Sequence, residues 1–137
     1  MNTSENNNPI FPQGERTSPD YFTGSAWLNV LVPKDETGTY AVANVVFAAG
    51  GRNNWHTHPA GQILLVTEGN GFYQERGKTA RPLTKGDVVV IPSGIEHWHG
   101  ATRDSSFTHI AITNSTTEGA VKWLSPVTED EYNSVHS

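Results

Sequence analysis

The sequence predicts an all-β protein made of one domain. Its 137 residues are enough for a single hydrophobic core and match the usual size of one domain. Thirteen glycines and eight prolines in a chain of this length indicate frequent turns. Short apolar and β-branched runs recur between these turns, about eight to ten in all, which is the spacing of a sandwich or a barrel. Long amphipathic helical patterns do not occur, so helices are not expected to form the core.

The expected strands follow one another along most of the chain. Turn residues at 35–38 and 49–51 separate the first strands, and a turn at 75–77 closes a hairpin. Near the end, Thr128 and Glu131 have the Thr-x-x-Glu form of a capping box, which predicts a short C-terminal helix. The strands are expected over residues 26–32, 39–48, 62–67, 71–74, 78–82, 88–91, 107–113 and 121–124.

The beginning of the chain differs from the rest in composition. Residues 1–19 are polar and rich in Asn, Ser and Pro, and we expect a flexible N-terminal arm there. Residues 20–137 then form the single domain. Because the arm starts with neither a basic nor an apolar stretch, it is not expected to be a signal peptide, and the expected location is cytoplasmic.

Charge and composition argue against several functions. The chain has nine Lys and Arg and fourteen Asp and Glu, which gives a net charge of −5. No basic run occurs, so no nucleic-acid partner is expected. No apolar run approaches the roughly 20 residues of a membrane span, so no membrane partner is expected. The absence of cysteine excludes disulfides, thiolate metal sites and a cysteine nucleophile.

Two histidines in the sequence Trp-His-Thr-His-Pro are candidates for metal binding. Residues i and i+2 of a strand point to the same face, so His56 and His58 can aim at one point, and Gln62 shares their parity if the strand is regular. Neutral imidazole is the commonest metal ligand, and an amide oxygen is a usable hard donor. The alternative is a polar loop in which both rings bond only to backbone.

Further histidines follow the same pattern. His97 and His99 repeat the His-x-His spacing, and His109 shares one face of its expected strand with Phe107 and Ala111. Strand parity therefore makes His99 and His109 candidates for the interior of the fold. The alternative for each is a structural histidine whose nitrogens are satisfied by backbone.

The spacing of these residues resembles the two-motif signature of the cupin superfamily. Cupins are small jelly-roll barrels, also described as double-stranded β-helices, and the resemblance runs from about residue 40 to residue 113. The matching positions are Gly50, His56, His58, Gln62 and Gly69 in the first motif, and Gly86, Pro92, Gly94 and His97 in the second.

The resemblance implies a metal site. Carried over position by position, the ligands of one divalent transition metal per chain would be His56, His58, Gln62 and His97. Manganese is the first expectation, and iron, cobalt, nickel and zinc are alternatives. Gln62 departs from the family pattern because Glu is usual there, and an amide leaves the ion with both positive charges and a stronger Lewis acidity. Ala101, where Asn is frequent, is a second departure outside the ligand set.

Several stretches are more closely similar to small bacterial cupins that include manganese-dependent hydroxynitrile lyases. That resemblance implies a small-molecule substrate and the cleavage or synthesis of cyanohydrins, with His99 or His109 taking the hydroxyl proton. A cupin dioxygenase or isomerase, and a metal-containing binding or sensor cupin without turnover, are the alternatives. The stretches are residues 55–62, 96–101, 108–109, 121–123 and 127–132.

A homo-oligomer, a dimer or a tetramer, is also expected. A small jelly roll leaves sheet edges and faces that a partner subunit often covers.

Overall fold

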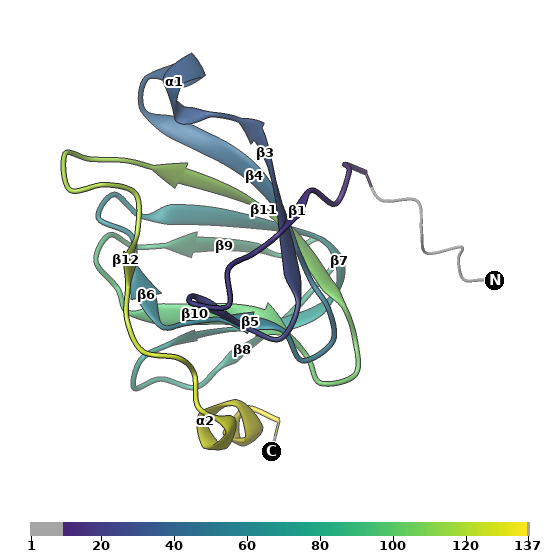
Figure 1. Ribbon diagram of the computed structural model, residues 1–137. Coiled ribbons are helices and arrows are strands. Elements are labelled where there is room, and N and C mark those ends of the chain that lie inside the picture. Colours follow the sequence, from purple (N-terminus) through teal and green to yellow (C-terminus); the bar gives the residue numbers. More distant parts are fainter. Residues whose placement is uncertain (1–9, 137) are drawn as a thin grey trace.

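The computed structural model describes residues 10–136 and shows two antiparallel sheets that curl around a common interior (Figure 1). This confirms the all-β jelly-roll prediction. The first sheet consists, in spatial order, of β1 (Glu15–Arg16), β3 (Ala26–Val32), β4 (Tyr40–Phe47), β11 (Phe107–Asn114), β7 (Gln62–Glu75) and β9 (Val88–Ile91). The second consists of β2 (Phe22–Thr23), β5 (Arg52–Asn53), β10 (His97–Ala101), the end of β7 and β8 (Arg81–Thr84). In addition, β6 (His56–Thr57) pairs with β10, and β12 (Lys122–Trp123) pairs with β6.

β7 belongs to both sheets. Separate strands were expected over 62–67 and 71–74, and this expectation is wrong, because β7 continues without a break. Gly69 has a φ of 77°, and the register with β11 shifts between Thr108 and His109. The glycine thus bends the strand from one sheet into the other, which a bulge with positive φ permits.

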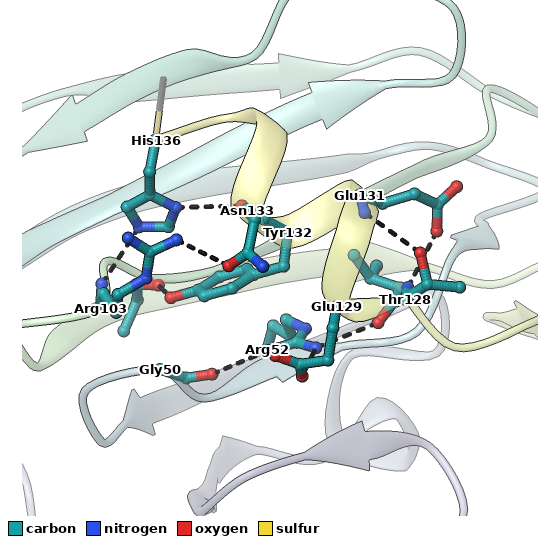
Figure 2. A network of polar contacts seen from close by, with 11 residues as sticks. Gly50, Arg52, Arg103, Thr128, Glu129, Glu131, Tyr132, Asn133 and His136 are labelled. Atoms are coloured by element: carbon teal, nitrogen blue, oxygen red, sulfur yellow. Dashed lines mark hydrogen bonds and ion pairs between the residues drawn. The ribbon is translucent and has the colours of Figure 1, made fainter.

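Within residues 10–136, two short helices complete the fold. α1 (Lys34–Thr37) occupies an expected turn. α2 (Glu129–Ser134) confirms the expected C-terminal helix: the hydroxyl of Thr128 accepts from the Glu131 N–H at 3.1 Å, and the Glu131 carboxylate accepts from the Thr128 N–H at 2.9 Å. Figure 2 shows α2 above Arg52, whose guanidinium contacts the Glu129 carboxylate at 2.8 Å. Among the described residues, no helix has the length and apolarity needed to cross a membrane.

Alternating residues along the strands point to opposite faces of the sheets, and the buried apolar side chains form two clusters. The barrel interior holds an apolar cluster that includes Phe47, Leu64 and Phe107. A second cluster lies between the outside of the second sheet and α2, and Trp98 and Tyr132 belong to it. Because Trp98 points outward, the neighbouring histidines of β10 point into the barrel.

The N-terminal arm expected over 1–19 is described only in part. Residues 1–9 lie outside the described residues. Glu15 and Arg16 pair with Leu28 and Trp27 of β3, so this part of the arm adds to the sheet edge. A two-residue polar strand carries no alternating pattern, so β1 could not be predicted from the sequence. The boundary of the domain at residue 20 stays a prediction.

Candidate metal centre

Five histidines meet inside the barrel. They lie on or next to β6, β10 and β11, and none exposes more than 4 % of its surface. The ring centroids of His56 and His97 are 4.2 Å apart, those of His56 and His58 are 4.9 Å apart, and those of His99 and His109 are 4.8 Å apart. The structure therefore brings together all five histidines that the sequence singled out, which are His56, His58, His97, His99 and His109.

Backbone carbonyls orient three of the rings. Nδ1 of His56 lies 2.7 Å from the carbonyl oxygen of Asn54, and Nδ1 of His97 lies 2.9 Å from that of Ile95. Nδ1 of His58 is likewise 2.7 Å from a carbonyl oxygen, that of Ala120. A carbonyl only accepts, so each Nδ1 carries the proton and each Nε2 keeps a lone pair. Histidine ligands of metals are typically held in this way.

The free nitrogens and one amide oxygen have the properties of metal ligands. Within residues 10–136, buried Nε2 of His58 and of His97 and buried Oε1 of Gln62 have no hydrogen-bond partner. The Gln62 Nε2 donates to the Thr113 hydroxyl at 2.8 Å, which leaves Oε1 as the free atom. Unpaired buried acceptors cost free energy, and a divalent transition ion would satisfy imidazole and amide donors. The residues present therefore fit a metal ion.

His99 also lies close to this group. One ring nitrogen each of His56, His97 and His99 lies within 4.8 Å of the others, so by distance alone His99 joins the cluster. Its Nδ1, however, lies 3.1 Å from Nε2 of His109. Among the described residues, the buried donors of His58, Gln62 and His97 have no partner, whereas one ring nitrogen of His99 is paired with His109. The expected ligand set of His56, His58, Gln62 and His97 therefore remains the preferred interpretation.

His99 and His109 form a buried pair held by an asparagine. The Asn53 Oδ1 accepts from the backbone N–H of His99 at 2.9 Å, and its Nδ2 is 3.3 Å from both ring nitrogens. Burial, followed by the proximity of His109, lowers the pKa of His99 well below its usual value. Burial also lowers the pKa of His109 to about 3. Both rings are therefore neutral at pH 7, and a neutral ring can accept a proton.

Three of the four expected ligands, His56, His58 and Gln62, line a cavity of about 220 Å³ together with His99 and His109. Apolar side chains form most of the remaining wall. Burial lowers the pKa of His97, which lies beside His56, to about 4. The cavity therefore offers neutral nitrogen donors in an apolar space. Its apolar wall is formed by Phe22, Leu28, Ala43, Val45, Val121 and Trp123, among others.

Comparison with known proteins decides the family. A protein-family model described as Cupin domain matches residues 43–113, just over half of the chain. The chain belongs to the cupin family.

Relatives of this cupin include a named lyase. An (R)-mandelonitrile lyase from Granulicella tundricola is 40% identical over 113 residues, which cover 82% of this chain and 86% of that protein. A solved cupin-like protein from Thermotoga maritima has a TM-score of 0.90 and 49% identity, over 93% of this chain and 97% of that chain. The Arabidopsis thaliana germin-like protein subfamily 2 member 1 is 34% identical over 97 residues, 66% of this cupin but only 44% of that protein.

Some residues of the site were not predicted from the sequence. Asn53 holds His99, and Thr113 orients the amide of Gln62. Thr113 shares the strand parity of His109 and Ala111, so its inward position could have been predicted from the sequence. Asn53 lies on a two-residue strand whose contact with His99 depends on the folded cupin, and no local pattern indicates it.

Proposed function

We propose that this cupin is a metal-dependent lyase that cleaves and forms small cyanohydrins. The observation that carries the proposal is the set of free buried donors of His58, His97 and Gln62 beside the neutral His99–His109 pair. The named activity of the mandelonitrile lyase relative supports the same reaction class.

Four side chains would hold the ion, namely His56, His58, Gln62 and His97. When bound, a divalent ion supplies Lewis acidity toward a substrate hydroxyl. Manganese is the first candidate, and iron, cobalt, nickel or zinc would suit the same donors. The neutral amide of Gln62 adds no negative charge to the centre, which favours Lewis-acid chemistry.

In this proposal, His99 accepts the proton of the substrate hydroxyl. With Nδ1 facing His109, Nε2 is the nitrogen that accepts this proton. The bond between the carbinol carbon and the nitrile carbon then breaks, which gives an aldehyde or ketone and cyanide. His99 returns its proton to cyanide, so that hydrogen cyanide leaves and the ring is neutral again.

The cavity wall suits the rest of such a substrate. Phe22, Val45, Val121 and Trp123 offer apolar contacts to the group carried by the carbinol carbon. The five histidines expose at most 4 % of their surface, so electrostatic interactions at the site are stronger than in bulk water.

An absorbance assay tests the reaction. Metal-loaded wild type is expected to release benzaldehyde from mandelonitrile well above background, and His97→Ala is expected to lose this activity together with bound metal. His136→Gln, which changes a histidine that follows α2, is the matched control and should behave as wild type. Equal rates for wild type and His97→Ala would reject the lyase.

Other outcomes of the same experiment would point to the alternatives. Oxygen consumption with small diols or enols, without benzaldehyde release, would indicate a dioxygenase. Stoichiometric metal without turnover of either substrate class would indicate a binding or sensor protein.

A further inference from the structure

Residues 120–125, here the C-terminal segment, cover the candidate metal centre although they follow the stretch matched by the cupin family. The Ala120 carbonyl accepts from Nδ1 of His58 at 2.7 Å. Trp123 pairs with His56 across β12 and β6, and their ring centroids are 4.8 Å apart. The segment therefore contacts two of the expected ligands directly.

Residues 20–22, here the N-terminal segment, meet the C-terminal segment over the cavity. The rings of Tyr21 and Trp123 stack at 4.7 Å with an interplanar angle of 12°. Phe22 lines the same cavity and lies 5.8 Å from the Trp123 ring. Two segments from opposite ends of the chain thus close one wall of the site.

Asn54 connects both segments to the barrel. Its side chain is buried, and its Nδ2 donates to the carbonyls of Asp20 at 3.2 Å and Leu124 at 3.4 Å. Its backbone N–H donates to the Tyr21 carbonyl at 2.8 Å. Its own carbonyl accepts from Nδ1 of His56 at 2.7 Å. One residue therefore joins the two segments and a ligand histidine.

We propose that Asn54 is a positioning residue of the metal centre. It holds the C-terminal segment in place, and this segment in turn fixes the ring orientation of His58 and covers His56. The inference rests on the metal centre proposed above. Its consequence is reciprocal: if the closed segments favour metal binding, bound metal must favour the closed segments by the same free energy.

Titration with Mn²⁺ tests the proposal, with the loss of the free aqua-ion signal in electron paramagnetic resonance as the readout. Asn54→Ala should bind Mn²⁺ about 10- to 100-fold more weakly than wild type, as is typical when a group that orients ligands is removed. Tyr132→Phe is the control, because it removes one hydrogen bond from α2 to the Ala101 carbonyl, 2.6 Å long, on the outer side of the second sheet (Figure 2). Its affinity should stay unchanged.

The outcomes distinguish the positioning role of Asn54 from the existence of the metal centre. Equal Mn²⁺ affinities of wild type and Asn54→Ala would overturn the positioning role, and so would an equal loss in Tyr132→Phe. Failure of wild type itself to bind Mn²⁺ would instead reject the metal centre.

Hydrogen exchange in wild type provides a test that does not depend on a variant folding. The Leu124 N–H donates to the Trp55 carbonyl at 2.8 Å, so exchange in the peptide covering 120–125 reports on closure of the C-terminal segment. Saturating Mn²⁺ should slow exchange there and leave the peptide covering α2 unchanged. Unchanged exchange at 120–125 would overturn the proposal.

Discussion

At the scale of single residues, Gln62 has the strongest influence on the expected chemistry. Thr113 accepts from its amide N–H, and its neutral Oε1 stays buried without a hydrogen-bond partner among the described residues. A carboxylate at this position would lower the charge of a bound divalent centre by one unit and reduce its Lewis acidity.

Gln62→Glu is therefore expected to retain metal and to lose lyase activity by about tenfold or more, which corresponds to about 1.4 kcal/mol in the barrier. Elemental analysis gives the metal content, and benzaldehyde release gives the rate. Thr113→Ser, which keeps the hydroxyl, is the control and should retain most activity. Full activity in Gln62→Glu would contradict the role given to the neutral amide.

His109 is expected to make the metal-free protein sensitive to acid. Burial holds its pKa at about 3, whereas the unfolded chain takes up a proton near pH 6.5. Between these two values the unfolded state binds more protons, so the free energy of unfolding falls as pH falls, by about 1.4 kcal/mol per pH unit for one such group.

His109→Phe should reduce this dependence, since Phe47 and Phe107 surround the ring at 5.7 and 5.5 Å. Urea unfolding of both metal-free proteins at pH 7, 6 and 5 measures the two slopes. Parallel slopes would show that His109 does not contribute.

The spacing of the histidines predicted where their side chains lie, but not what holds them. His56 and His58 share a face because of local strand geometry, and this can be read from the sequence. Asn54, in contrast, reaches the carbonyl of Leu124, 70 residues further along the chain. Such a contact exists only after the barrel has closed, so no local pattern reveals it.

At the scale of elements, β7 shows where the periodicity of the sequence stops predicting strand boundaries. The sequence around Gly69 and Gly71 reads equally well as a turn or as a bent strand, because glycine permits both. Pairing with β11 before Gly69 and with β8 after it distinguishes the two possibilities. Both pairings are long-range, so the bend became visible only in the structure.

α2 is an element whose stability can be changed without altering the metal centre. Thr128→Ala removes the oxygen that caps the helix and should lower the free energy of unfolding by about 1 kcal/mol. Thr128→Ser keeps a capping hydroxyl and should lose less. Urea unfolding measures both variants, and Mn²⁺ affinity should stay unchanged. Equal losses in the two variants would show that the cap is not the cause.

At the scale of the whole molecule, the outer face of the first sheet is unusually apolar. An antiparallel sheet with one face in water normally alternates apolar and polar residues. Here Ile63 pairs with Val90 on one side and with Ile112 on the other, and Val90 is 71% exposed. Apolar side chains occupy outward positions of this face at Val42, Ile63, Leu65, Val88, Val90, Ile110 and Ile112, and one polar residue, Asn44, lies on the same side opposite Ile110.

A second copy of the chain is the expected partner for this face. Homo-oligomers most often form two-fold contacts in which the same patch meets itself, and a contiguous apolar patch can do so. Light scattering should therefore show a dimer or a tetramer for wild type. Val90→Glu places a charge at the centre of each contact and should give the 14.9 kDa monomer. Val90→Thr keeps the shape without charge and should stay associated, whereas a monomeric wild type would refute the interface.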